Sequence, residues 1–179
     1  MAITLEEIGV YLKAKEFNFQ LDTEKEVIIS GMSDGTEKGA LLIRCKEDGE
    51  MFSLEMEPLN DDNSPWDIPK DHQYAHLILP QLLYANYNTK FGTWEYDPTD
   101  GDIKYTIEIP VQDGTITQKQ FERILSGVDT AFEYQAKFKH IYNTGTMPPE
   151  EDASAELQKM LEQMLTQIKA SKKDEGDGI

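Results

Sequence analysis

The sequence predicts an α+β fold in which an antiparallel sheet packs on helices, in the order α-β-β-β-α-β-β-α, with an extra helix at the C-terminus. Three features predict this class. Segments such as residues 52–57 alternate apolar and polar residues, which is typical of antiparallel strands with one buried face. Residues 92–127 contain a strand, a tight turn, a second strand and a capped helix. Threonines stand directly before two segments with helical apolar spacing.

The first helix is expected to begin after Thr4 and to end near residues 15–16. Thr4 and Glu7 have the spacing of a capping box, in which each side chain accepts a hydrogen bond from the other residue's backbone N–H. The apolar residues at helical spacing are Leu5, Ile8 and Leu12, with Tyr11 beside them. Residues 17–19 then indicate an extended segment that leads into the sheet.

Three strands are expected next, at residues 27–29, 41–45 and 52–56. The turn at residues 33–36 has the sequence Ser-Asp-Gly-Thr, whose residue types favour turns. An Asp-Gly pair within residues 47–50 predicts a hairpin between the second and third strands. Every second residue of the third strand is apolar, so we expect one face against the core and one face in water.

Trp66 stands in a polar loop, residues 58–70, that is rich in proline and aspartate. A tryptophan in such a loop either packs back onto the core or presents a contact surface to a partner. Core packing is favoured, because a large aromatic side chain usually buries most of its area. The contact role is kept as the second interpretation, which makes Trp66 a candidate protein-binding residue.

A second helix is expected over residues 71–89. Its apolar stripe consists of Ala75, Ile78, Leu82 and Ala85, and it is widened by Leu79, Leu83 and Tyr87. Pro80 either kinks this helix or occupies the first turn of a shorter one, because proline has no N–H to donate within a helix. We favour one kinked helix.

Residues 92–127 give the clearest local signal. Strands at residues 93–97 and 103–109 flank a turn that has proline and glycine where their backbone preferences suit it. Thr117 caps the third helix, which is expected to continue through Ile141. The apolar stripe of this helix consists of Phe121, Ile124, Leu125, Val128 and Phe132.

The chain is expected to divide near a Pro-Pro pair. Residues 1–145 form the α+β domain, and residues 146–179 comprise a hinge, an amphipathic helix over about residues 151–170 and a disordered tail. The apolar stripe of this last helix consists of Leu157, Met160, Leu161, Met164, Leu165 and Ile168. The stripe packs either on its own domain or, because methionine suits adaptable surfaces, on another chain. These six residues are therefore candidate protein-binding residues.

The formal net charge of −17 comes from 34 acidic and 17 basic residues. Such a charge repels phosphate backbones and anionic lipids, so binding to nucleic acid or to a membrane is not expected. No apolar run approaches the roughly 20 residues of a membrane-spanning helix, and the N-terminus lacks the pattern of a secretory signal. Cys45 is the single cysteine and allows no internal disulfide, which favours the cytoplasm. Cys45 itself is interpreted as a buried apolar residue.

Each candidate pattern for catalysis or metal binding fails on spacing or on a missing residue. The acidic turn at residues 97–102 has its glycine at the fifth position, whereas an EF-hand loop needs glycine at the sixth. His72 and His76 are four residues apart, but glutamine follows His72 where a metalloprotease motif has glutamate. Glu95 and Asp97 share one strand face and are the carboxylate pair to consider first. We predict a protein with no catalytic residues, no cofactor and no metal site.

Several motifs resemble the YbjN family, also called the bacterial sensory transduction regulator family, and the likeness is greatest to its cyanobacterial members. The motifs are YNTK at residues 87–90, WEYD at 94–97, DGDI at 100–103, IEIP at 107–110, TITQKQF at 115–121 and LSG at 125–127. The resemblance covers about residues 4–132. It implies a fold like that of type III secretion chaperones, which often dimerise and present a protein partner. The family has no agreed catalytic residues, so the resemblance assigns none.

Two features depart from this family pattern. Pro80 interrupts the second helix, and the helix after the Pro-Pro pair is an addition to the family core. Both bear on how such a protein would dimerise.

Three hypotheses on function follow from the sequence. The preferred one is a non-enzymatic, chaperone-like or regulatory cytoplasmic protein that binds a protein partner of unknown identity. The second is a small acidic hydrolase or metal-binding protein that uses carboxylates near Glu95 and Asp97. The third is a structural homodimer assembled through the C-terminal helix.

Overall fold

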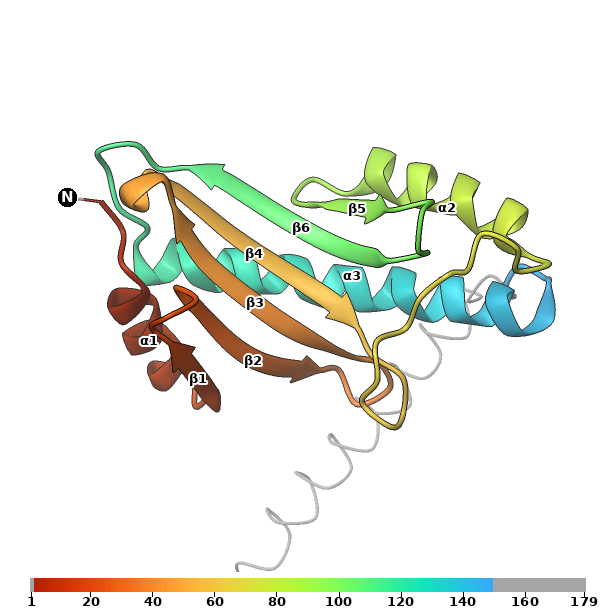
Figure 1. Cartoon of the computed structure of the whole chain (residues 1–179), viewed down its shortest axis with the longest axis horizontal. Coiled ribbons are helices and arrows are strands. Elements are labelled where there is room, and N and C mark those ends of the chain that lie inside the picture. The colour runs from red at the N-terminus through yellow and green to blue at the C-terminus, as the bar shows by residue number, and fades with distance from the viewer. Residues whose placement is uncertain (1, 150–179) are drawn as a thin grey trace, which may run out of the picture. The chain divides into compact units, whose positions relative to one another are not determined.

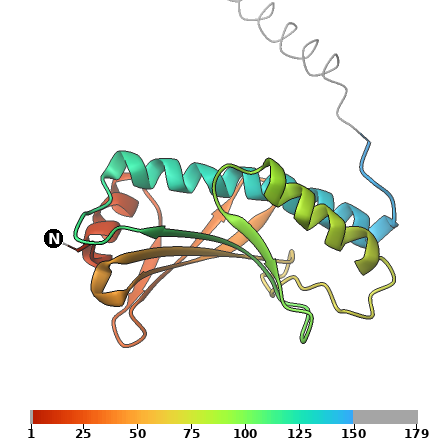
Figure 2. The same cartoon turned by 90° about the horizontal axis from the view of Figure 1, so that it is seen from above.

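A six-stranded antiparallel sheet carries three α-helices on one of its faces in the computed structural model, which describes residues 2–149 (Figures 1 and 2). Residues up to Met147 form one compact unit. The arrangement is the α+β class that the sequence predicts. The helix expected over residues 151–170, with its six candidate contact residues, lies outside the described residues. The domain boundary near residue 146 therefore stays a prediction.

The strands lie side by side in the order β1-β2-β3-β4-β6-β5, and every neighbouring pair is antiparallel. Their bounds are β1 Phe19–Asp22, β2 Val27–Ser33, β3 Lys38–Lys46, β4 Met51–Pro58, β5 Thr93–Tyr96 and β6 Ile103–Pro110.

Three details differ from the sequence-based expectation. Residues 19–22 form a strand of their own, because Phe19 pairs with Ser30 and extends the sheet by one strand beyond β2. β2 runs on to Ser33, since its pairing with β3 continues as far as Lys38. The Asp-Gly turn is a short 3₁₀ helix, η1 Glu47–Gly49, rather than a simple hairpin turn.

The inner face of the sheet is apolar, as the alternation predicts. Its central residues are Leu41, Ile43, Leu54, Met56, Tyr105 and Ile107, all buried. The outer face is only partly exposed to water. The alternation predicts that Ser53 of β4 lies in water on this face, whereas the structure buries it. Ser53 lies between Arg44 and Glu108 in the register, and the long side chains around it shield it completely.

The first and third helices begin where the sequence predicts. The second helix begins at Ala75 and not at residue 71, so His72 lies in the preceding turn and not on the helix with His76. α1 Leu5–Ala14 starts with the capping box of Thr4 and Glu7, and α3 Gln118–Thr144 starts with a second capping box made by Thr117 and Gln120. The helix between them in the chain, α2 Ala75–Asn88, runs through Pro80 as a single element, as favoured above. Figure 2 shows all three helices on the same side of the sheet. The five residues predicted for the α3 stripe are all buried, as are Phe138 and Ile141 further along the helix.

A buried polar cluster ties α3 to the turn between β2 and β3 and to the loop at residues 59–74. The Glu37 carboxylate accepts hydrogen bonds from Lys139 Nζ at 2.7 Å and from Gln135 Nε2 at 2.8 Å. Lys139 Nζ also donates to the Leu59 carbonyl at 2.8 Å. Trp66 packs beneath this cluster, with Lys139 Nζ 5.8 Å from its ring centre. One lysine therefore fixes the helix, the turn and the loop together.

A second junction connects α2 to β5. The Tyr105 hydroxyl donates to the Phe91 carbonyl, and burial raises the pKa of Tyr105 to about 12, so the hydroxyl keeps its proton at neutral pH. Gly92 has φ +80, and a Cβ at this position would collide with the Tyr105 ring and hydroxyl. Only glycine allows the chain to turn this close to the tyrosine. In this way α2 and β5 are held at a fixed angle.

We expect Gly92→Ala to destabilise the protein by about 2–4 kcal/mol. Alanine is strained at the positive φ of this position, and its methyl group would collide with the Tyr105 ring. Gly35→Ala is the matched control. Gly35 also has a positive φ, of +96, but a Cβ there would meet nothing within 4 Å, so only backbone strain of about 1 kcal/mol applies. Urea unfolding of both variants measures the difference, and equal losses would contradict the steric role of Tyr105.

We expect Lys139→Met to cost about 2–4 kcal/mol, since it leaves the buried Glu37 carboxylate without its cation. Lys15→Met removes a lysine that pairs with Glu122 at 3.7 Å on the surface, and should cost less than about 1 kcal/mol. Thermal unfolding followed by circular dichroism compares the two. A Lys139 variant as stable as the Lys15 variant would show that the cluster does not hold the loop.

Candidate protein-binding surface

α2 is attached to the domain by one stripe of small and branched side chains. Ala75, Ile78, Leu82 and Ala85 are all buried, as the sequence predicts. Two further contacts fix the end of the helix. The Asn86 side chain accepts from the Trp94 N–H at 2.7 Å and donates to the Trp94 carbonyl at 3.0 Å. The Asn86 amide thus pairs with the outer edge of β5 as a neighbouring strand would.

The opposite face of α2 is apolar as well, although it points away from the core. Leu83 is 73% exposed, Tyr84 60% and Tyr87 88%, and Leu77 is also exposed. With about 100° between successive residues, these side chains and Pro80 lie on the half of the helix opposite the buried stripe. This set of Leu77, Pro80, Leu83, Tyr84 and Tyr87 is called the α2 outer face below.

This surface corrects one sequence-based expectation. The apolar spacing predicts that Leu83 and Tyr87 widen the buried stripe, whereas the structure exposes both. The physical reason is the narrowness of the contact, because α2 lies at the edge of the sheet against α3 and β5 and only one side of the helix is covered (Figure 2). His76 and Asn88 are the exposed polar residues of α2, and the other exposed side chains of the helix are apolar or tyrosine.

The composition of α2 separates it from the rest of the chain. Its 14 residues include no Asp, Glu, Lys or Arg, whereas 28% of the whole chain is charged, so about four would be expected. A surface helix normally carries polar and charged residues on its outer side. A contiguous exposed apolar surface with this composition is typical of a protein-binding site. The absence of charge in residues 75–88 is the sequence signal by which the surface could have been found.

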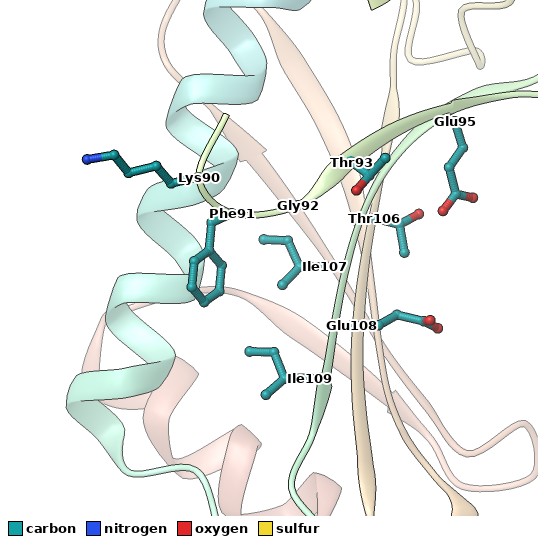
Figure 3. A pocket seen from close by; sticks show the side chains of 9 residues that line it. All are labelled: Lys90, Phe91, Gly92, Thr93, Glu95, Thr106, Ile107, Glu108 and Ile109. Atoms are coloured by element: carbon teal, nitrogen blue, oxygen red, sulfur yellow. The ribbon is translucent and has the colours of Figure 1, made fainter. Parts of the chain in front are cut away.

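The apolar surface continues beyond α2 on both sides. Burial raises the pKa of Tyr134 on α3, and the nearby Tyr84 hydroxyl raises it further, which places the two tyrosines close together. Lys137 Nζ lies 5.1 Å from the Tyr134 ring centre. At the other end of α2, Phe91 is exposed and lines a surface hollow of about 300 Å³ with Ile107 and Ile109 of β6 (Figure 3).

The outer face of the sheet is charged instead. Glu55 lies within 4 Å of three cations, with Arg44 at 3.3 Å and both Lys46 and Lys104 at 3.8 Å. Lys46 also pairs with Glu108 at 2.9 Å, and Lys104 pairs with Glu95 at 3.7 Å. Charged side chains of both signs cover this face, so it is a weaker candidate for an apolar partner than the α2 outer face.

Glu95 and Asp97, the predicted carboxylate pair, form contacts with neighbouring residues of the β5–β6 hairpin. Asp97 accepts hydrogen bonds from the Thr99 N–H and hydroxyl, which lowers its pKa, and its side chain is exposed on the β5–β6 turn. Glu95 faces Lys104. The hollow that Glu95 and Asp97 share, about 340 Å³, is lined further by Tyr96, Pro98, Asp102 and Lys104 and by no histidine.

The other candidates for chemistry also have structural contacts. His72 stacks on Tyr142 at 3.8 Å between ring centres. Burial, followed by the charges of Glu6 and Glu7, raises the pKa of the Cys45 thiol to about 11, which keeps it protonated and weakly nucleophilic at neutral pH. Among residues 2–149, no group of three or more histidine, cysteine or carboxylate side chains is arranged to hold a metal ion.

Trp66 lies where core packing requires. The indole is 5% exposed and packs edge-on to Tyr142 at 5.7 Å between ring centres. Of its two interpretations, the structure supports core packing, and a contact role would require the loop at residues 59–74 to open. The remaining candidate contact residues, from Leu157 to Ile168, lie outside the described residues.

Comparisons with known proteins give the fold. The sequence matches no protein-family model and no curated protein. Among solved structures, the chain is similar to YbjN from E. coli, with 12% identity, a TM-score of 0.51, and coverage of 81% of this chain and 96% of that chain. It is also similar to a chain of the HopA1–SchA chaperone–effector complex, with 16% identity, a TM-score of 0.45, and coverage of 71% and 86%. Within the described part of the chain, no helix has the length and apolar character to cross a membrane.

Carboxylates gather beside Trp66 and make stability depend on pH. Burial raises the pKa of Glu57 and of Asp67, and the charge of Asp102 raises both further. A carboxyl group with a raised folded-state pKa binds its proton more tightly in the folded protein. Its stabilising contribution is therefore complete below the usual carboxyl pKa of about 4 and is lost as the pH rises through the raised pKa.

We expect Asp102→Asn to stabilise the protein at pH 7 by about 0.5 kcal/mol or less, because solvent screens these partly exposed groups. At about pH 3 the two partners are protonated, so the variant and the wild-type protein should unfold at the same urea concentration. Urea titrations at both pH values test this. A stabilisation of the same size at the acidic pH would show that charge repulsion is not its cause.

Proposed function

We propose that this protein is a non-enzymatic binding module, chaperone-like or regulatory in type, that holds a protein partner on the α2 outer face. One observation carries the proposal: a helix without charged residues exposes Leu83, Tyr84 and Tyr87 in a chain with a net charge of −17. Water-exposed leucine and tyrosine side chains gain free energy when a partner covers them. Tyrosines are also frequent among the residues that dominate binding energy at protein interfaces.

The chemistry of the surface limits the partner. Because α2 offers apolar contacts and tyrosine hydroxyls but no ion pairs, the complementary surface is apolar, such as one side of an amphipathic helix. Around it, the acidic chain repels partners of the same sign and favours basic or neutral ones. The fold shared with YbjN is compatible with this proposal but does not identify the partner.

The finer assignments are proposals of the same kind. Membership of the YbjN family rests on the motifs at residues 87–127 and on the fold, and the likeness to cyanobacterial members stays a prediction. A cytoplasmic location rests on the single cysteine, Cys45. A second copy of the chain is one candidate partner for α2, whereas the homodimer through residues 157–168 involves a segment outside the described residues.

The double variant Leu83→Glu, Tyr87→Glu tests the proposal. Both side chains are exposed, so the variant should fold with a free energy of unfolding within about 0.5 kcal/mol of the wild type. Charge in an apolar interface should weaken partner binding by roughly a hundredfold or more. The control is Val10→Glu, which changes an exposed apolar residue on α1.

The measurements are quantitative affinity capture from native lysate and sedimentation equilibrium of the purified protein. We expect the wild type and the Val10 variant to retain the same protein, or to form the same dimer, and the double variant to lose it. If all three proteins retain the same partners and the same mass, the α2 outer face is not the binding surface.

A further inference from the structure

The last strand of the sheet leaves part of β6 without a neighbour on one side. β4 pairs with β6 from Tyr105 to Pro110, whereas β5 pairs with β6 only from Ile103 to Thr106. Within the described part of the chain, residues 107–110 thus have β4 on one side and no strand on the other. Exposed backbone of this kind can accept a further strand.

The register of β4 and β6 determines which backbone groups face the open side. The Val111 N–H donates to the Glu50 carbonyl, so Val111 belongs to a hydrogen-bonded pair with the β4 side. Hydrogen-bonded residues alternate along an antiparallel strand, so Ile107 and Ile109 also bond toward β4. The N–H and C=O of Glu108 and the C=O of Pro110 then face the open side. Proline has no backbone N–H, so Pro110 leaves no unpaired donor on the open side, as expected for proline at a sheet edge.

β5 cannot cover this edge because the chain before it turns away. Gly92, at φ +80, diverts the backbone, and the Phe91 carbonyl accepts from the Tyr105 side-chain hydroxyl instead of from a backbone N–H of β6. The outer edge of β5, in contrast, is satisfied by Asn86 at the Trp94 backbone. The fold therefore protects one stretch of this sheet edge and leaves the adjacent stretch of β6 open.

The open edge lies in the surface hollow of about 300 Å³ that Phe91 lines, and the hollow has two kinds of wall. Phe91 lies on the same side of β6 as Ile107 and Ile109, and Glu95 and Glu108 lie on the other side (Figure 3). Successive side chains of a strand point to opposite faces. A strand placed here would direct every second side chain toward the apolar wall and the others toward the carboxylates.

We propose that β6 binds an extended segment of a protein partner at residues 107–110, and that this segment alternates apolar residues with lysine or arginine. Backbone hydrogen bonds to Glu108 and Pro110 would hold the strand, and the two walls would select its pattern. This inference goes beyond the proposed function, because it concerns a second surface, the edge of β6, and an extended segment in place of an apolar surface.

The net charge of the chain favours a basic segment over an acidic one at the hollow. Lys46 pairs with Glu108 at 2.9 Å and Lys104 pairs with Glu95 at 3.7 Å, both at the surface, and the Lys90 side chain points away from both glutamates (Figure 3). The chain as a whole is strongly acidic, with a net charge of −17. Because solvent-exposed ion pairs are weak, a lysine or arginine of the bound segment would take the place of Lys46 or Lys104 at the carboxylate wall, and the net negative charge of the chain would attract it.

The probe is a short synthetic peptide of alternating lysine and valine with a fluorescent label, titrated with the full-length protein and followed by anisotropy. Three peptides serve as controls: the same residues in block order, glutamate alternating with valine, and an alternating lysine–valine peptide N-methylated on every second residue. Glu108→Lys reverses the charge of one wall. Glu24→Lys is its matched control, at the turn between β1 and β2 on the opposite edge of the sheet.

We expect the alternating lysine–valine peptide to bind the wild-type protein. Each control peptide should bind the wild type about tenfold more weakly or worse, and the Glu108 variant should bind the alternating peptide with a similar loss. The Glu24 variant should bind as the wild type does. Hydrogen exchange of the Glu108 amide should slow when the peptide is bound. Equal binding of the block-order peptide, unchanged exchange at Glu108, or no binding of the alternating peptide would each overturn the proposal. None of these outcomes bears on α2, so failure here leaves the proposed function intact.

Discussion

The contact between Tyr105 and the Phe91 backbone determines how both candidate surfaces are formed. Because the phenol occupies the space beside Gly92, the chain that leaves α2 must turn before it enters β5. That turn places α2 against α3 and β5 by one side, so the other side of the helix is exposed. The same turn keeps β5 short and leaves the end of β6 open. A larger residue at position 92 would disturb both surfaces at once.

The two ends of the domain use different interactions to hold their helices. At the far end of α3, a charged cluster around Glu37 and Lys139 is shielded from water and fixes the loop that contains Trp66. Around α2, the contacts are apolar or made by the neutral amide of Asn86. A helix held without charges can exchange water for an apolar partner without desolvating an ion, and this makes α2 the more favourable place to bind a protein.

Local patterns were sufficient to predict most of the fold. Capping threonines, alternating strands and the stripe of α3 depend on neighbours in the chain, and the structure has each of them. The α2 outer face could not be predicted in the same way, because periodicity shows that Leu83 and Tyr87 are apolar but not which side of the helix the domain covers. The open stretch of β6 depends on the tertiary contact at Tyr105, which no local pattern reveals. The buried position of Ser53 likewise depends on the long side chains of neighbouring strands.

The central claim is that the α2 outer face is covered by another protein surface when the protein functions. Site-specific photo-crosslinking in cells measures this directly, with a photoreactive amino acid at position 83 and, as a control, at position 10, where Val10 is 62% exposed on α1. We expect one discrete crosslinked product from position 83, with a partner or a second copy, and none of the same mass from position 10. No product from position 83, or identical products from both positions, would contradict the claim.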